Sequence, residues 1–133
     1  MPADTKRPAP STKPLAVKLG IKPGFSVLLA EAPKGFAGAL EPLPAGASLG
    51  AAREPADLIL FFVTNPENVR SGLPRLKPLL KPGGLFWIAW RKGGVGEVTR
   101  DNVWPIAVAF GLQPVANVAI DEEWSALRFK VVA

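Results

Sequence analysis

The chain has 133 residues, of which 48% are hydrophobic and 20% charged, a composition typical of one globular domain. Cysteine, histidine and tyrosine are absent, which excludes disulfides, thiol catalysis, Cys/His metal sites and a Ser-His-Asp triad. The net charge is +5, but residues 1–24 hold five of the 16 basic side chains and one of the 11 acidic ones. The remainder is nearly neutral, so the sequence carries no strong nucleic-acid signal.

The first 14 residues combine small and charged side chains with four prolines, Pro2, Pro8, Pro10 and Pro14. This composition predicts a flexible, Pro-rich basic tail at 1–14, with residues 15–133 forming a single domain. The first long apolar run, residues 25–30, is too short for a membrane span and too far along the chain for a signal peptide. Together with the lack of cysteine, this predicts a cytoplasmic protein with no membrane contact.

Three unbroken apolar runs follow at residues 27–30, 58–63 and 85–90. None alternates polar with apolar side chains, so each strand needs cover on both faces. That requirement is typical of central parallel strands between helices. The runs therefore predict an α/β domain with a mostly parallel sheet between two helical layers.

A helix is predicted after the second run, where Thr64 or Asn65 can cap it and Pro66 suits its first turn. Its apolar stripe has helical spacing and consists of Val69, Leu73, Leu76 and Leu80. Pro74 interrupts the stripe, which predicts a kink or two shorter helices. The Lys-Pro-Gly-Gly segment at 81–84 is expected to end the helix.

Another helix is predicted after the third run, with Thr99 or Asp101 as its cap and Gly111 closing its end. Its apolar face consists of Val103, Ile106, Ala107 and Phe110. Pro105 is tolerated if the helix begins at Asp101, because the first-turn amides have no partner to lose.

The last part of the chain predicts an antiparallel hairpin, with strands at 112–120 and 124–132. Side chains alternate along the second strand, with Ser125, Leu127, Phe129 and Val131 facing one way and Trp124, Ala126, Arg128 and Lys130 the other. Two charges predict that part of one face is wet. The turn between the strands holds Asp121, Glu122 and Glu123, which cannot all face one ion, so we expect a solvated turn and no metal site.

The shorter elements are less regular. Residues 15–19 predict an amphipathic turn, residues 36–40 a short helix, and residues 47–49 a short edge strand. The sequence has four tryptophans, Trp87, Trp90, Trp104 and Trp124. We expect them in the core, with Trp90 and Trp124 as exceptions near strand ends.

This order of elements resembles class I S-adenosylmethionine-dependent methyltransferases over about residues 25–132. The resemblance rests on 57–60, which looks like the central strand of that family, and on 76–88, which looks like its Leu-Lys-Pro-Gly-Gly turn and following strand. It implies a three-layer, Rossmann-like α/β fold of shortened methyltransferase type. The chain also resembles a bacterial protein family of this shape through 18–24, 31–33 and 123–129, which implies a fold and no catalytic residues.

The family's first strand ends in an acidic residue and a GxGxG turn that lets the backbone close on the cofactor. Here the acidic position falls on Leu29 and the first two glycines fall on Glu31 and Pro33, leaving only Gly35. Pro33 has no amide hydrogen to donate. No cofactor is therefore expected. If S-adenosylmethionine does bind, the resemblance implies Glu31, Gly35 and Asn65 as its contacts.

Two interpretations fit Asn65. Asn65-Pro66 matches part of the (N/D)PP(Y/F) motif of amino-group methyltransferases, and it also matches a helix cap followed by a first-turn proline. Anion binding is expected elsewhere, at Trp90, Arg91 and Lys92, because ligands bind beyond the carboxyl ends of parallel strands. A solvated loop is the alternative for that segment. We expect any anionic partner to meet Arg91 and Lys92 first and the N-terminal tail more weakly.

Two functions remain open from the sequence. The altered cofactor turn predicts a methyltransferase-like domain without methyltransferase activity, which binds a small molecule or a protein. The Lys-Pro-Gly-Gly turn and Asn65 favour the alternative, an active S-adenosylmethionine-dependent methyltransferase with an atypical cofactor loop. No catalytic residue is assigned.

Overall fold

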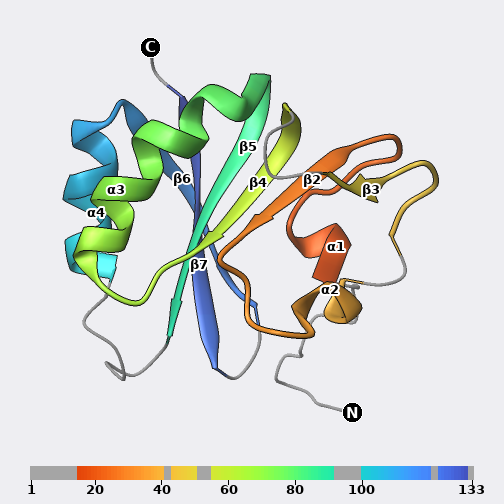
Figure 1. The fold of residues 1–133 in the computed structure, drawn as a ribbon, viewed down its shortest axis with the longest axis horizontal. Coiled ribbons are helices and arrows are strands. Elements are labelled where there is room, and N and C mark those ends of the chain that lie inside the picture. The colour runs from red at the N-terminus through yellow and green to blue at the C-terminus, as the bar shows by residue number, and fades with distance from the viewer. Residues whose placement is uncertain (1–14, 41–42, 51–54, 92–99, 121–122, 132–133) are drawn as a thin grey trace.

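The computed structural model describes residues 15–40, 43–50, 55–91, 100–120 and 123–131. These residues form one sheet of six strands in the order β3-β2-β4-β5-β7-β6 (Figure 1). The strands are β2 (Ser26–Ala30), β3 (Ser48–Leu49), β4 (Ala56–Phe62), β5 (Leu80–Arg91), β6 (Leu112–Ala119) and β7 (Trp124–Val131). The first four run parallel, whereas β7 is antiparallel to both β5 and β6.

Helices cover both faces of the sheet (Figure 1). Two short helices, α1 (Leu15–Lys18) and α2 (Phe36–Ala39), lie on one face. The other face carries α3 (Pro66–Leu76), the 3₁₀ turn η1 (Lys77–Leu79) and α4 (Arg100–Ala109). The predicted fold class is confirmed: a three-layer α/β fold with a mostly parallel sheet and a C-terminal antiparallel hairpin.

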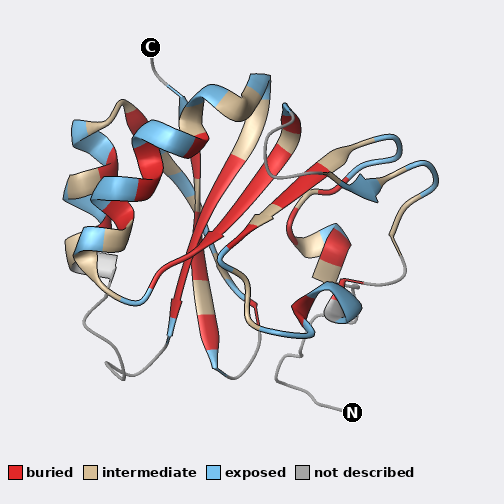
Figure 2. Cartoon of the chain, in the orientation of Figure 1, coloured by how far each residue is buried: buried red, intermediate tan, exposed pale blue. Residues whose placement is uncertain are grey.

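The central strands are buried because helices or loops cover each of their faces. In β4, Ile59 and Phe61 pack into the core beneath α3 and α4, while Leu58 and Leu60 pack into a second core on the face of α1 and α2. The buried residues form a continuous band along the middle of the sheet (Figure 2). A strand that contributes to two cores has no polar face to alternate, which explains its unbroken apolar sequence.

The Lys-Pro-Gly-Gly segment belongs to β5, not only to the end of the preceding helix as predicted. Ala56 pairs with Leu80 and Leu58 pairs with Leu85, so residues 81–84 leave the register and form a bulge. Gly83 has φ 78°, which glycine adopts without steric cost. The strand therefore begins five residues earlier than the apolar run, because its first pair precedes the bulge.

Helix α3 does not divide at Pro74. It runs from Pro66 to Leu76 with Pro74 inside it, and η1 then leads directly into β5. Leu73 and Leu76 are fully buried on either side of the proline. Their packing against the sheet offsets the hydrogen bond that the proline removes.

Helix α4 also departs from the prediction. It begins at Arg100, so Asp101 lies inside it and Pro105 falls beyond the first turn, while Thr99 lies outside the described residues. Trp104 is 45% exposed and not in the core, because the face carrying Val103 and Ala107 is the one turned to the sheet. Gly111, at φ 83°, follows the helix end as predicted.

The hairpin forms as predicted between β6 and β7, and its turn residues 121–122 lie outside the described part of the chain. Trp90 and Trp124 are each 6% exposed, so both belong to the core and are not the exceptions that we expected. On the sheet edge, β6 carries Pro114, and its register with β7 shifts between Pro114 and Ala116. None of the described helices is long and apolar enough to cross a membrane.

Candidate functional site

The chain reverses its direction of travel across the sheet between β2 and β4. From β2 it moves outward to β3 at the edge, then returns past β2 to β4. In open α/β sheets, ligands bind beyond the carboxyl ends of the strands at such a switch point. The candidate site is therefore sought where Ala30 and Phe62 end their strands.

A cleft of about 410 Å³ lies at this point. We call it the switch-point cleft, and it is lined by Glu31, Phe61, Phe62, Thr64, Asn68, Ser71, Arg75 and Trp124. Five of these eight side chains are polar or charged, although the strands beneath are apolar. A convergence of polar groups at the expected end of the sheet marks this cleft as the candidate functional site.

Helix α3 supplies the polar wall of the cleft. Asn68, Ser71 and Arg75 follow one another at spacings of three and four, which places them along one side of the helix. Its buried side, which includes Val69 and Leu73, faces the sheet. The apolar side chains of the helix therefore pack against the core, and the neighbouring row of polar side chains lines the cleft.

The start of α3 is fixed by two asparagines. The side chain of Asn65 accepts a hydrogen bond from Asn68 N at 2.9 Å, so Asn65 is the N-cap of the helix. Asn68 Oδ1 in turn accepts from Thr64 N at 2.9 Å and from Thr64 Oγ1 at 2.8 Å. These bonds orient the side-chain amide of Asn68, which lines the cleft, and they leave its Nδ2 hydrogens as donors.

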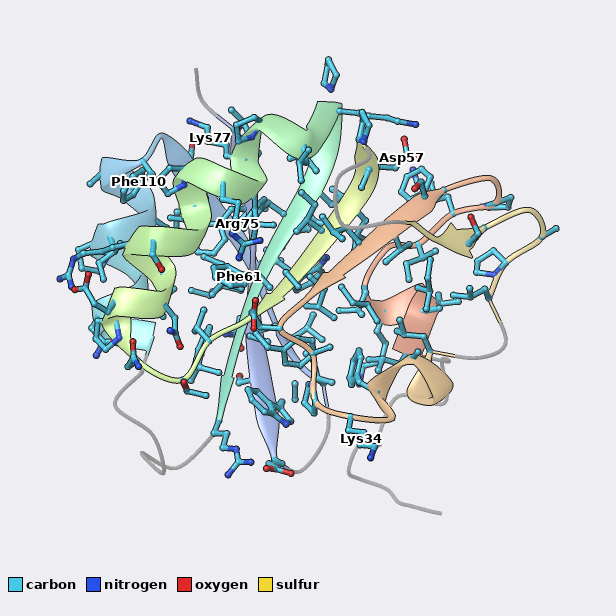
Figure 3. All side chains as sticks on the ribbon, viewed as in Figure 1. Lys34, Asp57, Phe61, Arg75, Lys77 and Phe110 are labelled. Carbon is cyan, nitrogen blue, oxygen red and sulfur yellow. The ribbon has the colours of Figure 1, made fainter. Side chains whose placement is uncertain are left out.

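An ion pair crosses the cleft between β2 and α3. Arg75 Nη2 lies 3.7 Å from Glu31 Oε2, and the two side chains are 55% and 67% exposed. Figure 3 shows the Arg75 side chain lying over the sheet near Phe61. Glu31 has φ 58°, a left-handed conformation that is uncommon outside glycine and turns the chain sharply after β2. The turn sets its carboxylate opposite the helix.

An aromatic cluster supports the other side of the cleft. The Phe62 ring meets Trp124 edge-on at 5.0 Å and Phe36 at 4.8 Å between centroids. Such edge-to-face contacts stabilise by about 0.5–1.5 kcal/mol beyond the buried area. Phe36 belongs to α2, so the cluster joins that short helix to β4 and β7 beside the polar wall.

The residues expected to contact a cofactor are separated in the structure. Glu31 lines the switch-point cleft, whereas Asn65 caps α3 with its side chain. Gly35, at φ 83°, precedes α2 as its N-cap residue and is not among the lining residues of the cleft. Only one of the three therefore reaches the cleft wall.

Two of the three residues expected to bind anions, Trp90 and Arg91, lie in the described part of the chain. Trp90 packs in the core beneath α3 and α4. Arg91 Nη2 lies 2.9 Å from Glu123 Oε2, and its guanidinium carbon lies 5.5 Å from the Trp124 ring centroid. Lys92 and the glycine-rich segment 93–96 lie outside the described residues. No group of acidic side chains in the described part of the chain is arranged to hold a metal ion.

Sequence reasoning missed Asn68, Ser71 and Arg75. Their signal was present as a polar stripe beside the apolar one, but a polar helix face is usually solvated and carries no functional meaning alone. The polar face of α3 is marked as part of a site by Glu31. Glu31 lies 44 positions before Arg75 in the sequence and comes close to it only in the folded structure.

No protein-family model and no curated protein sequence matches the chain. Solved structures do match. An S-adenosylmethionine-dependent methyltransferase from Aquifex aeolicus superposes with a TM-score of 0.64 at 14% identity, covering 89% of this chain and 88% of that one. The fibrillarin of Aeropyrum pernix, solved with natively bound S-adenosylmethionine, gives 0.57 at 15% identity, with 87% and 73% covered.

The N-methyltransferase NodS of Bradyrhizobium japonicum, in complex with S-adenosylhomocysteine, also matches with a TM-score of 0.57 at 15% identity, covering 88% of this chain and 82% of that one. Identities this low show a shared fold and nothing finer. The chain therefore has the Rossmann-like methyltransferase fold.

Proposed function

We propose that this protein binds a small zwitterionic molecule in the switch-point cleft and does not transfer methyl groups. One observation carries the proposal: a carboxylate on Glu31 and a guanidinium on Arg75 face each other across a polar cleft at the switch point. A ligand with both a carboxylate and an ammonium group, such as an α-amino acid, can engage both. Its carboxylate meets the planar fork of Arg75, and its ammonium meets Glu31.

The ion pair costs little to open. Both side chains are more than half exposed, and exposed pairs of this kind contribute about 0–1 kcal/mol. A ligand that inserts between them replaces one weak contact with two charge-assisted ones, each stronger than a neutral hydrogen bond. The Glu31 carboxylate and the Arg75 guanidinium therefore lie close together but remain available to a ligand.

The remaining lining residues provide orientation. Asn68 and Ser71 of α3 and Thr64 just before it supply amide and hydroxyl groups, and Trp124 supplies an aromatic surface. The volume of about 410 Å³ lies within the usual range of small-molecule sites, about 300–1,000 Å³. The site thus combines fixed charges, neutral hydrogen-bonding groups and an apolar surface in a volume suited to a ligand of amino-acid size.

The residues at the family's cofactor turn do not fit S-adenosylmethionine in the way that the family holds it. The turn needs backbone amides that approach the cofactor closely, and here Glu31 and Pro33 take the positions of two glycines. Pro33 has no amide hydrogen, and Glu31 adds a carboxylate that pairs with Arg75. We derive no methyl-transfer step through this site.

Titration calorimetry of the full chain tests the proposal. The ligands are the twenty common amino acids, S-adenosylmethionine and S-adenosylhomocysteine. We expect at least one amino acid to bind. S-adenosylmethionine carries the same amino-acid group, but the glycine turn that would receive its larger remainder is absent, so we expect no saturable heat up to about 100 μM. The methyl ester and the N-acetyl form of the amino acid that binds should each lose affinity, because each removes one of the two charges.

Two arginines of α3 provide a matched pair of variants. Arg75→Ala should weaken amino-acid binding about tenfold or more, because a hydrogen bond to a charged group contributes about 1.5–3 kcal/mol. Arg70→Ala should leave it unchanged, since Arg70 pairs with Glu67 at 2.9 Å and does not line the cleft. Equal effects of the two substitutions, or no binding in the whole series, would contradict the proposal.

The second candidate is an active methyltransferase with an atypical cofactor loop. The shared fold favours it, as do the cofactor and its product in two of the matching structures. This candidate predicts a dissociation constant of about 1 μM or tighter for S-adenosylmethionine and methyl transfer to a trapped substrate. Either result would replace the first proposal.

A further inference from the structure

A second and larger hollow lies at the opposite end of the sheet, where the parallel strands begin. Its volume is about 780 Å³, and we call it the amino-end groove. The end of α3, the bulge at the start of β5, the residue after α4 and the last residues of β7 surround it. It shares no lining residue with the switch-point cleft.

The walls of this groove are mainly apolar. Leu73 is buried beneath it, while Leu80 and Phe110 are partly buried along it and pack against the same core. Three prolines, Pro74, Pro78 and Pro82, add rigid apolar surface. A largely apolar concave surface of about 300–1,000 Å³ with a few polar groups is the usual form of a small-molecule site.

Three lysines are the charged groups of the groove, and none of the residues that line it is acidic. Lys77 Nζ donates to the carbonyl oxygen of Phe110 at 2.6 Å, which fixes the ammonium beside the groove (Figure 3). Lys81 Nζ lies 3.5 Å from Asp57 Oδ2. Lys130 is exposed and has no acidic partner among the described residues. The groove therefore has an excess of positive charge around an apolar interior.

We propose that the amino-end groove binds an anionic amphiphile, a molecule with an unbranched hydrocarbon chain and a carboxylate head. The hydrocarbon chain lies along Leu80 and Phe110, and the head meets Lys130 and Lys77. Neither the apolar walls nor the lysines would be enough to bind a ligand without the other. A small anion gains little from lysines exposed to water and salt, and a neutral hydrocarbon leaves the cations unused.

The first test compares two head groups on the same chain. Decanoate and decyltrimethylammonium, both below their micelle concentrations, are titrated into the full chain by calorimetry. We expect decanoate to bind and the ammonium compound not to. Octanoate should bind about 15-fold more weakly than decanoate, because two fewer methylenes are buried. Equal binding of the two head groups, or no binding of decanoate, would overturn the proposal.

Charge reversal at the rim locates the site. Lys130→Glu should weaken decanoate binding about three- to tenfold, since an exposed attraction becomes a repulsion. Lys34→Glu is the matched control, because Lys34 is also exposed but lies at the other end of the molecule from Lys77 (Figure 3). A Val131→Asp variant adds a charge to the wall and should weaken binding as well. Unchanged affinity in both groove variants would place decanoate elsewhere and refute the assignment.

A vesicle experiment distinguishes binding of a free amphiphile from attachment of the protein to a membrane surface. Co-sedimentation with phosphatidylglycerol vesicles in the absence of decanoate binding would replace the proposal with attachment to anionic lipid surfaces. Amide chemical shifts around Leu85 and Val131 should move on addition of decanoate, while those around Glu31 should not. Because the two sites share no residue, Arg75→Ala should leave decanoate binding intact.

Discussion

The switch-point cleft and the amino-end groove lie at opposite ends of the same sheet and offer opposite kinds of chemistry. The switch-point cleft brings a carboxylate and a guanidinium into reach of each other, together with hydroxyl and amide groups. The amino-end groove is almost twice as large, with apolar walls and cations alone at its rim. One suits a polar ligand that carries both signs of charge, and the other suits an apolar ligand that carries a negative charge.

Helix α3 contributes to both sites, which explains how one short segment supports two chemistries. Its polar stripe, from Asn68 to Arg75, lines the switch-point cleft. Its last turn, with Leu73 and Pro74, and the following Lys77 line the amino-end groove. Charge and polarity therefore change along the helix axis as well as around it, and substitutions in α3 are the direct way to test whether the two sites are independent.

The largest loss of stability is expected from a substitution at the contact between α3 and the sheet. A Cβ at Gly72 would lie 2.1 Å from Phe61 Cζ, and Phe61 itself is fully buried. Gly72→Val should therefore lower the free energy of unfolding by about 3 kcal/mol, measured by urea denaturation, because the helix must move away from β4. Both sites should lose ligand affinity together.

Gly38→Ala provides the control for Gly72→Val. Gly38 lies in α2, and a Cβ added there would have no heavy atom within 4 Å, so the new methyl group meets open space. Its stability should stay equal or rise by up to about 1 kcal/mol. A Gly72→Val protein as stable as the parent chain would mean that α3 does not hold the two sites in a common frame.

A substitution at Asp57 is expected to change ligand binding at the amino-end groove only. Its carboxylate accepts a hydrogen bond from Ser26 N at 2.8 Å and pairs with Lys81 at 3.5 Å. Asp57→Ala should cost about 1–2 kcal/mol of stability, since a partly buried amide loses its acceptor. Decanoate should nevertheless bind more tightly, about threefold, because Lys81 then lacks a competing carboxylate.

The companion variant Asp57→Asn retains an acceptor for Ser26 and removes only the charge. It should show the gain in decanoate affinity with less than half of the loss in stability. Amino-acid binding at the other end of the sheet should be the same in both variants. A loss of decanoate affinity on removing Asp57 would contradict the electrostatic account of the groove.

The smallest effect is expected at the start of α3. Asn65→Ala removes the cap that Asn68 N uses and should cost about 1 kcal/mol in thermal or chemical unfolding. Because Asn68 lines the switch-point cleft, amino-acid affinity should fall while decanoate affinity does not. Asn65→Asp keeps a capping oxygen and should behave as the parent chain. Equal losses at both ends would show that fraying of the first turn spreads through the helix.

The fold was largely predictable because its strongest signals are local. The unbroken apolar run at 58–63 indicates a strand buried on both faces, as β4 is. The alternation along 124–131 indicated the hairpin strand but not its burial, because Trp124 and Ala126 pack on one face of β7 and Leu127 and Phe129 on the other. Predictions failed where the outcome depended on distant packing. Pro74 stays within a helix because Leu73 and Leu76 are buried against the sheet, and Trp104 is exposed because α4 turns another face inward.

The candidate site was less predictable than the fold. Local motifs indicated Glu31 correctly as a residue at the strand end, but nothing near it in the sequence indicated Arg75. Arg91 shows the converse. It is the last residue of the central strand β5, near where the ligand-binding prediction required it, yet Glu123 from the hairpin turn lies 2.9 Å from it. Whether Arg91 and Lys92 bind anions stays a prediction. Site chemistry depends on pairs of residues that only the topology brings together.

The edges of the sheet have a consequence for self-association. At one edge β3 offers two residues of strand, and at the other β6 is interrupted by Pro114 and a register shift. Unpaired strand edges are templates on which further chains can add, and shortness, proline and bulges are the features that prevent this. Both described edges of the sheet therefore disfavour the addition of further chains through backbone hydrogen bonds, even at high protein concentration.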